Sequence, residues 1–565
     1  MKHPILFLLI VAACIRVSWG AYQAASPAEP ALSHYVPSGA LLYLQAKDFS
    51  ALLADWNKSA EKQNWLKSSN YEVFSRSRLF LRLADASREF SSAAALPADT
   101  NLLRQVAGTQ SALAIFDIGK LQFLYISRLP SAGSTQSALW QTRSKFETRN
   151  AAGVDFFYRR DAESGREVAF AVTGDYLILA TREDLMAGAL QLIKGSSGPA
   201  MESEAWWSQS VATAKDAGDL RMVLNLEKIV PSPYFRSYWV QQNITDLKQY
   251  TAVISDLTLS GKEYQEERTL LRKTPTSAEA MQNAGPAALA EIVRLVPSQA
   301  GFYEAKADPT PQECLSLLET KILAPHPGPR AAGKLAPQAQ IGNGETGLSS
   351  DLETRIDQPP TQPGDSVNNA APLQAMLSKN PPSAILRTQS TEKDKDGVFV
   401  RIHFAVALLG ASDWNEAEVR KALADFVRPS FTTGQLGINW QPNASGFALD
   451  GLWTLSVSVN GKYLFISDDG GLISAMLSNL KQTNAQQPAM YVAAFDHSRA
   501  RENFLALTRL LDKSAGSSGA GDRPDFFSKN IGSLSSTLAG VSSEKIVIRD
   551  AGDKVMQTVT YEWSH

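Results

Sequence analysis

Two stretches of the chain share one pattern of apolar and polar positions. The first covers 168–181 and turns at Thr173-Gly174-Asp175, and the second covers 455–468 and turns at Asn460-Gly461-Lys462. Alternating apolar residues lie on both sides of each turn, and the glycine supplies the positive φ that a tight hairpin needs. Apolar residues at helical spacing follow each hairpin. The pattern therefore predicts, twice, a β-hairpin that leads into a helix.

A second motif also occurs twice. Val-Pro-Ser-x-Ala begins at Val36 and again at Val296, and a tyrosine follows at the same distance in both copies. These copies lie 260 positions apart, whereas the hairpin tyrosines Tyr176 and Tyr463 lie 287 positions apart. The difference predicts a net insertion of 27 residues in the second half. The segment 325–382, rich in Pro, Gly, Gln and Asn and without aromatic residues, is expected to be a disordered insertion at this place.

The remaining periodic segments are further hairpins joined by helices, including closing hairpins at 252–273 and 545–563. Meander connections of this kind favour the α+β class over a regular alternation of strands and helices. We therefore expect two homologous lobes, each an antiparallel sheet with helices packed on one face. Lobe 1 is predicted to cover 35–275 and lobe 2 to cover 286–563.

The first residues have the pattern of a signal peptide at 1–20, with a short basic start and an apolar run that is too short to span a membrane. An Ala-, Pro- and Ser-rich tether at 21–34 follows. Cleavage after Gly20, lipidation of Cys14 in a lipobox-like Val-Ala-Ala-Cys sequence, and retention as an uncleaved anchor are three alternatives. Each of them predicts an extracytoplasmic protein of the periplasm or cell envelope, secreted or anchored to the membrane only through its N-terminus.

Charge and cysteine content narrow the function classes. The chain has 55 Lys and Arg residues against 57 Asp and Glu residues, a formal net charge of −2. Such a balance gives no indication of a nucleic-acid partner. Cys14 and Cys314 are the two cysteines of the sequence, so a chain processed after Gly20 has no internal disulfide.

Candidate catalytic groups are few: Asp468, Asp469 and His403. The two aspartates follow a predicted strand, where paired carboxylates can hold a metal or perform acid–base chemistry, but the same place suits a helix N-cap. Thr181 stands at the corresponding place in the first copy and is expected to cap the helix that follows it. His403 alternates with an apolar face of its strand and is expected on the wetter face.

The sequence predicts no metal site and no cofactor. The histidines and cysteines lack metal-ligand spacing such as H-E-x-x-H or C-x-x-C. A G-x-G-x-x-G match at 342–347 lies inside the Pro- and Gly-rich segment, without the strand and helix that a dinucleotide site requires.

An aromatic stretch is the least ordinary local sequence of the chain. Tyr234 and Tyr238 stand four residues apart, as do Phe235 and Trp239, so a helix here presents a wide aromatic face. Packing in the core is one interpretation of this face. The alternative is a surface that contacts an envelope protein, a glycan or a membrane.

The exported start, the Val-Pro-Ser-x-Ala-x-x-Tyr opening at 36–43 and the Ser-Pro-Tyr-Phe-Arg-Ser-Tyr-Trp run at 232–239 resemble a family of exported bacterial proteins classed as a domain of unknown function. The resemblance implies the location and the architecture and carries no catalytic residues. We expect a non-enzymatic envelope protein with a binding or structural role. The alternative is an envelope hydrolase with its site in a cleft between the lobes.

Overall fold

The structure is a computed structural model that describes residues 30–59, 62–63, 66, 69–214, 217–233, 247–260, 263–276, 285–323, 369–393, 400–431, 439–450, 454–482, 489–496, 499 and 541–563. The chain divides into two compact units. Unit 1 comprises Met1–Ser277, Ala515–Ser542 and Asp550–His565, and unit 2 comprises Ala278–Ser514 and Ser543–Arg549. Each unit combines an antiparallel sheet with helices, as the α+β class requires.

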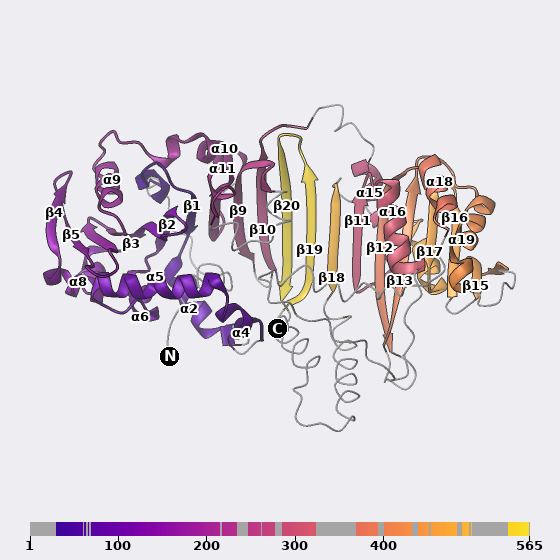
Figure 1. Ribbon diagram of the computed structural model, residues 1–565, viewed down its shortest axis with the longest axis horizontal. Helices are drawn as coiled ribbons and strands as arrows, with labels where there is room; N and C mark the ends of the chain where they lie inside the picture. Colours follow the sequence, from indigo (N-terminus) through magenta and orange to yellow (C-terminus); the bar gives the residue numbers. More distant parts are fainter. Residues whose placement is uncertain are drawn as a thin grey trace, which may run out of the picture. The chain divides into compact units, whose positions relative to one another are not determined.

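Unit 1 contains one antiparallel sheet in the order β4-β5-β6-β7-β3-β2-β1-β8-β9-β10-β20 (Figure 1). Its strands are β1 (Leu42–Ala46), β2 (Gln110–Asp117), β3 (Gln122–Arg128), β4 (Glu147–Ala151), β5 (Val154–Arg160), β6 (Glu167–Thr173), β7 (Tyr176–Ala180), β8 (Leu220–Asn225), β9 (Tyr250–Ser260), β10 (Glu263–Arg272) and β20 (Lys554–Trp563).

The helices of unit 1 lie on both faces of this sheet. They are η1 (Leu32–Tyr35), α2 (Phe49–Lys58), α4 (Ser69–Ser75), α5 (Arg78–Ala94), α6 (Thr100–Val106), α7 (Ser131–Ser134), α8 (Ala138–Gln141), η2 (Arg143–Lys145), α9 (Glu183–Ile193), η3 (Met201–Ser203), α10 (Ala205–Thr213) and α11 (Leu226–Ile229).

Unit 2 has the sheet order β14-β15-β16-β17-β13-β12-β11-β18-β19, again antiparallel throughout. This order is that of β4 to β9 in unit 1 with every strand number increased by ten. The strands are β11 (Phe302–Ala307), β12 (Pro382–Lys393), β13 (Val400–Gly410), β14 (Gln441–Asn443), β15 (Gly446–Asp450), β16 (Thr454–Asn460), β17 (Tyr463–Ser467), β18 (Tyr491–Asp496) and β19 (Val541–Asp550).

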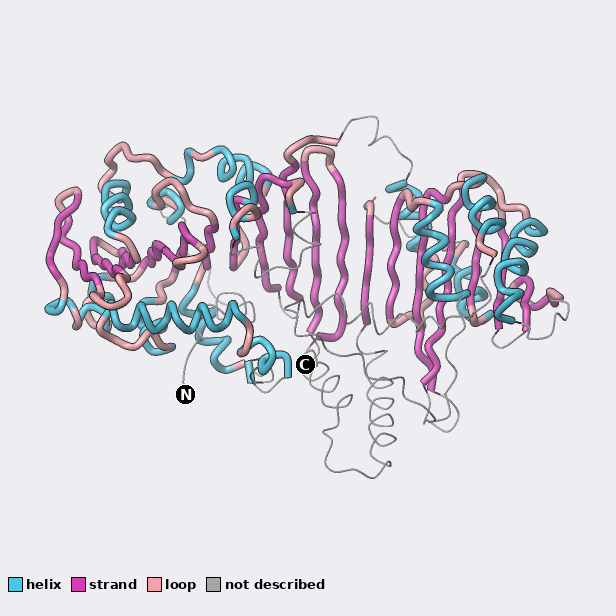
Figure 2. The backbone as a smooth tube through the Cα atoms, in the orientation of Figure 1, coloured by secondary structure: helices cyan, strands magenta, loops and turns pink. Residues whose placement is uncertain are grey.

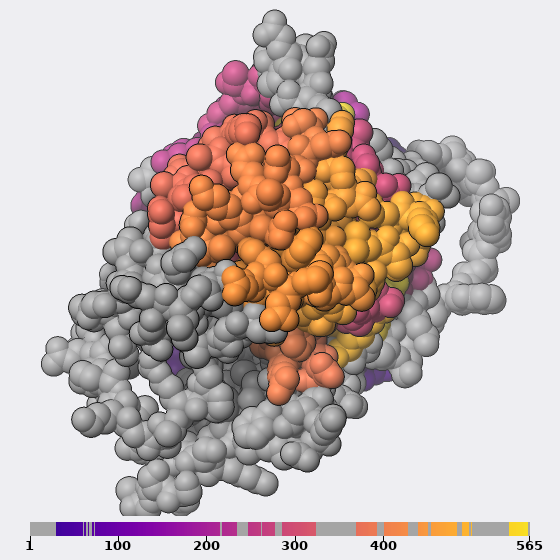
Figure 3. Space-filling model, turned by 90° about the vertical axis from the view of Figure 1, so that its right-hand side faces the viewer, coloured from indigo at the N-terminus to yellow at the C-terminus, as the bar shows by residue number. Residues whose placement is uncertain are grey.

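The helices of unit 2 are α15 (Gly285–Val293), α16 (Pro311–Leu318), the π-helix η4 (Glu319–Leu323), α18 (Ala371–Lys379), α19 (Glu416–Phe431) and α20 (Gly470–Asn479). Figure 2 shows these helices beside the strands of the unit, and the space-filling view of Figure 3 faces the end of unit 2 that includes α18, α19 and the β14–β15 hairpin.

The two predicted hairpin–helix segments are present. β6 and β7 pair through the turn at Gly174 and are followed by α9, and β16 and β17 pair through the turn at Gly461 and are followed by α20. The φ angles of the two glycines are 55° and 57°, in the left-handed region that an L-residue side chain disfavours. The predicted turn chemistry therefore holds in both copies.

The prediction that helices pack on one face of each sheet is wrong. Along β3, Leu124 and Ile126 join a core with α9 and α10, while Tyr125 joins a second core with α5 and α6 on the opposite face. Unit 2 repeats this arrangement, with α15 and α20 on one face and α16, α18 and α19 on the other. The central strands, such as β3, β7, β13 and β17, are apolar on both faces, so they lie between two helical layers.

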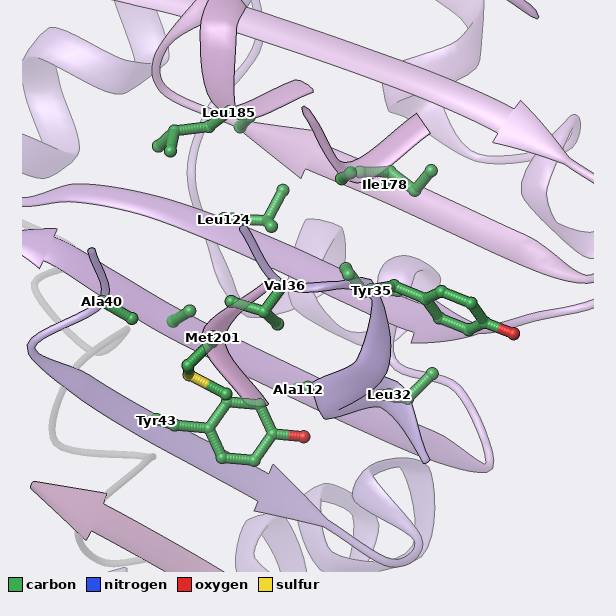
Figure 4. Packing of buried hydrophobic residues seen from close by; sticks show 14 of the residues in the cluster. Leu32, Tyr35, Val36, Ala40, Tyr43, Ala112, Leu124, Ile178, Leu185 and Met201 are labelled. Atoms are coloured by element: carbon green, nitrogen blue, oxygen red, sulfur yellow. The ribbon is translucent and has the colours of Figure 1, made fainter. Parts of the chain in front are cut away.

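One of these cores is continuous across unit 1. Figure 4 shows part of it, where Leu32 and Tyr35 of η1 lie over the strands and Met201 lies near the ring of Tyr43. Tyr43 is fully buried and its ring also meets that of Trp207 edge to face, with ring centroids 4.9 Å apart. Buried aromatic groups of this size make a large contribution to core stability.

Two predicted boundaries also need correction. The disordered insertion was placed at 325–382, but 371–379 forms α18, which buries Leu373, Met376 and Leu377 against α16 and α19. Residues 324–368 lie outside the described part of the chain. Lobe 2 was expected to include the closing strand, but β20 belongs to unit 1, where it pairs with β10 from Glu263–Glu562 to Leu271–Lys554.

Candidate functional site

A cavity of about 160 Å³ lies in unit 1, on the face of the sheet that α2, α5 and α6 cover. Its floor comes from β1, β2, β3, β7 and the first residue of β8, and its roof comes from the three helices. Apart from Ser87, Ser111, Arg166, Thr181 and the hydroxyl of Tyr125, the lining is apolar. The apolar residues are Leu44, Ala46, Phe49, Leu52, Leu83, Ala86, Phe90, Ala98, Leu102, Leu103, Val106, Ala112, Leu113, Ile115, Leu121, Phe123, Leu179 and Leu220.

The cavity separates two parts of the core on this face. One part surrounds Phe90 and Leu102, and the other surrounds Phe49 and Leu52, and members of both line the space. Protein interiors are normally packed without voids of this size. Small side chains at the lining positions Ala86 and Ser87 of α5 leave room between the helix and the sheet.

The polar groups of the floor are satisfied by one another. The Tyr125 hydroxyl donates to the carbonyl oxygen of Val106 at 2.9 Å and is hydrogen-bonded to the Ser111 hydroxyl at 3.0 Å. Burial raises the pKa of Tyr125 to about 12, so the phenol stays protonated. The floor therefore presents mostly carbon to anything that occupies the cavity.

Arg166 is the cation in the cavity wall. Its side chain is 7% exposed, and its Nη2 donates to Glu89 Oε2 at 2.6 Å while Nη1 donates to the carbonyl oxygen of Lys120 at 2.7 Å. Arg82 Nη1 donates to the other oxygen of Glu89 at 3.0 Å. Partial burial opposes ionisation of Glu89, but the hydrogen bonds from the two guanidinium groups hold its pKa below the usual value.

These groups suit binding rather than catalysis. Among the described lining residues, Arg166 is already engaged by Glu89 and by the Lys120 carbonyl, and the buried Tyr125 phenol stays protonated. An apolar pocket with few polar groups is the usual form of a small-molecule site.

Two of the predicted catalytic residues lie close together in unit 2. His403 on β13 has its Nδ1 3.7 Å from Asp468 Oδ1 and its Nε2 3.7 Å from Glu392 Oε2. The Asp468 carboxylate raises the pKa of His403 above its usual value, although partial burial of the imidazole opposes this. The expectation of a wetter face is wrong in part, because His403 shares its strand face with the buried residues Ala405 and Ala407 and is itself 18% exposed.

Asp468 and Asp469 have separate structural roles. Asp469 is the N-cap of α20 and accepts the N–H of Gly471 at 2.8 Å. Asp468 Oδ1 accepts the backbone N–H of Phe404 at 2.8 Å, and its side chain is 8% exposed. The three candidates therefore do not form one cluster.

The predicted cap at Thr181 is wrong. Arg182 occupies the N-cap position of α9 and makes no side-chain capping bond. The Thr181 hydroxyl instead accepts the backbone N–H of Phe123 at 2.8 Å. This contact links β7 to β3, as Asp468 links β17 to β13.

The remaining predicted sites are outside the described part of the chain. Tyr234, Phe235, Tyr238, Trp239 and Cys14 all lie there. Cys314 is described, and it is buried in α16.

The cavity was not anticipated from the sequence. Its lining comes from many separate segments between Leu44 and Leu220, and a space between helices has no periodic signal. The alanines and serines of α5 are the local sign that this helix does not fill the gap above the sheet.

Among the described residues, no helix is both long and apolar enough to cross a membrane. In the same part of the chain, no three His, Cys, Asp and Glu side chains gather into a group that could hold a metal ion.

No protein-family model and no curated protein matches the chain. Among solved structures, it is similar to three crystal forms of TP0453. Form I has a TM-score of 0.23 and 13% identity and covers 45% of this chain and 84% of that one. Form IV has a TM-score of 0.22 and 12% identity, with coverages of 42% and 79%, and form III has a TM-score of 0.23 and 11% identity, with coverages of 45% and 84%. At these scores the likeness supports no conclusion about fold or function.

Proposed function

We propose that this chain is an exported cell-envelope protein that binds an apolar small molecule in the cavity of unit 1 and does not catalyse a reaction. The cavity is the observation that carries the proposal. Its volume is close to that of an engineered apolar cavity of about 150 Å³ that holds benzene. The bound group is accordingly an alkyl or aryl portion of roughly six carbon atoms.

The proposal includes a common ancestor for the two halves of the chain. The repeated strand order supports this, as do the glycines at the equivalent turns. Thr181 and Asp468 also support it, since each accepts the N–H of a phenylalanine on the neighbouring strand.

The export part of the proposal rests on the leader sequence and is tested separately. Cell fractionation, followed by mass spectrometry of the mature N-terminus, distinguishes cleavage after Gly20, lipidation of Cys14 and an uncleaved anchor. Recovery of the protein from the cytoplasm with Met1 intact contradicts export.

Ligand binding is tested on the full chain by isothermal titration calorimetry with octan-1-ol. Binding with a negative heat-capacity change is expected, because apolar surface leaves water. Ala86→Phe places a ring in the cavity and is expected to weaken binding about tenfold or more, since each buried methylene is worth about 0.8 kcal/mol. Ala84→Phe, on the same helix but outside the lining, is the matched control. Absence of octan-1-ol binding, or equal loss in both variants, contradicts the proposal.

A hydrolase is the second candidate function, and the proximity of His403 to Asp468 favours it, because a carboxylate beside an imidazole is the arrangement of a general base. Turnover of p-nitrophenyl esters that disappears in His403→Gln supports this candidate. Equal hydrolysis rates for the unmodified protein and His403→Gln exclude the hydrolase.

An envelope protein or glycan is the proposed partner of the aromatic face at 234–239.

A further inference from the structure

The polar cluster at the cavity wall has an excess of positive charge. Arg82 and Arg166 share one carboxylate, that of Glu89, through hydrogen bonds of 3.0 and 2.6 Å. In the adjacent β2–β3 turn, the Asp117 carboxylate accepts the backbone N–H of Lys120 at 2.8 Å and is not part of this cluster. The cluster of Arg82, Glu89 and Arg166 therefore has a net charge of +1.

This cluster connects the apolar space with solvent. Arg166 lines the cavity and is 7% exposed, whereas the side chains of Arg82 and Glu89 are 25% and 31% exposed. A molecule that lies in the cavity with one end at Arg166 therefore has that end group beside both guanidinium groups. A partly buried cation pair of this kind favours an anionic group.

The backbone fixes the positions of both arginines. Arg82 Nε donates to the carbonyl oxygen of Gly119 at 2.9 Å, and Arg166 Nη1 donates to that of Lys120 at 2.7 Å. The two guanidinium groups thus donate to the carbonyl oxygens of two consecutive residues in one turn. Fixed donors of this type lose little conformational entropy when an anion binds.

From this arrangement we infer that the ligand is an amphiphile with a carboxylate head, held at Arg82 and Arg166, and an alkyl chain in the cavity. The inference rests on the proposed function, because it assigns the ligand class of the same cavity. It distinguishes a fatty acid from a neutral apolar molecule of equal length.

The experiment compares octanoate with octan-1-ol by calorimetry at pH 8 and low salt. Octanoate is expected to bind about tenfold more tightly, as one charge-assisted hydrogen bond provides. Arg82→Gln leaves the Glu89–Arg166 pair in place but removes the excess charge, and it is expected to reduce the preference for octanoate over octan-1-ol to within about twofold.

Arg88→Gln is the matched control. It removes the same charge from the same helix, at a side chain that is 78% exposed and paired with Asp85, and is expected to retain the preference for octanoate. Equal binding of the two ligands by the unmodified protein overturns the carboxylate head but leaves the cavity as a binding site. An equal loss of the preference for octanoate in Arg82→Gln and Arg88→Gln also overturns the carboxylate head and leaves the cavity as a binding site. If neither ligand binds, the proposed function itself fails.

Discussion

Thr181 and Asp468 make the same contact in the two units of this protein. Each follows the second strand of a repeated hairpin, and each accepts the backbone N–H of a phenylalanine on the adjacent strand at 2.8 Å. The backbone N–H of each residue also returns a bond to the carbonyl oxygen of that phenylalanine, at 3.0 Å for Thr181 and 3.3 Å for Asp468. The two side chains differ in charge but occupy equivalent places in the strand pairing.

This equivalence predicts a structural role for Asp468. Asp468→Ala leaves the N–H of Phe404 without its side-chain acceptor and is expected to lower the free energy of unfolding by about 1–3 kcal/mol. Asp468→Asn retains an acceptor oxygen and is expected to cost less. Urea unfolding curves of the two variants give the comparison, and an Asn variant as unstable as the Ala variant assigns the effect to charge instead.

The surroundings of His403 predict that the free energy of unfolding depends on pH. Its pKa is raised above the ordinary value of 6.5, chiefly by Asp468, with Asp469 and Glu392 adding to the effect. Protonation of His403 therefore contributes fully to the stability of the folded protein below about pH 6.5. This contribution is lost as the pH rises through the higher pKa that His403 has in the folded state.

The measurement is the difference in unfolding free energy between the unmodified protein and His403→Gln at several pH values. This difference is expected to decrease from pH 6 to pH 9. A difference that grows with pH shows that His403 is held neutral by burial instead.

Arg272 of β10 forms an ion pair with Asp550, the last residue of β19, directly before the turn that leads into β20. Its two terminal nitrogens donate to the two carboxylate oxygens of Asp550 at 2.8 and 2.7 Å, and the side chains are 18% and 23% exposed. Arg272→Met is expected to destabilise the protein by about 1–3 kcal/mol, because a largely buried carboxylate loses its partner.

The control for Arg272 is Arg182→Met, which breaks the exposed pair of Arg182 and Asp184. Exposed pairs are worth about 0–1 kcal/mol. Equal effects of the two substitutions in urea unfolding contradict the role assigned to Arg272.

Cys314 is expected to be unreactive in the folded protein. Burial raises the pKa of its thiol to about 12, so the reactive thiolate is scarce at neutral pH. Alkylation by iodoacetamide, followed by mass spectrometry in a Cys14→Ser background, is expected only after denaturation. Rapid labelling without denaturant indicates that α16 opens locally.

The sequence allowed prediction of the elements whose patterns are local. The hairpins around Gly174 and Gly461 combine alternating apolar residues with a specific turn residue, and both are confirmed. The edge strands β4 and β14 were missed, because they are mostly exposed and polar, as Glu147–Ala151 illustrates. Polar edge strands limit unwanted pairing but weaken the alternation that identifies a strand.

Properties that depend on packing were harder to predict. α18 was assigned to a disordered segment because Pro and Gln surround its few apolar residues, yet Leu373 and Leu377 are fully buried against neighbouring helices. Likewise, neither the cavity under α5 nor the cluster of Arg82, Glu89 and Arg166 follows from a local pattern. The cluster joins α5 to Arg166 in the chain between β5 and β6, and only the tertiary fold brings these segments together.

The position of β20 has a consequence for biosynthesis. Unit 1 is built mainly from the first 277 residues, but the strand that pairs with β10 comes from the last residues of the chain. A ribosome that makes this protein releases that strand only after all of unit 2 has been translated. Contacts so distant in sequence slow folding. The N-terminal unit therefore completes its sheet last, and a premature stop codon at any position from Ala278 to Arg549 leaves both units unfinished.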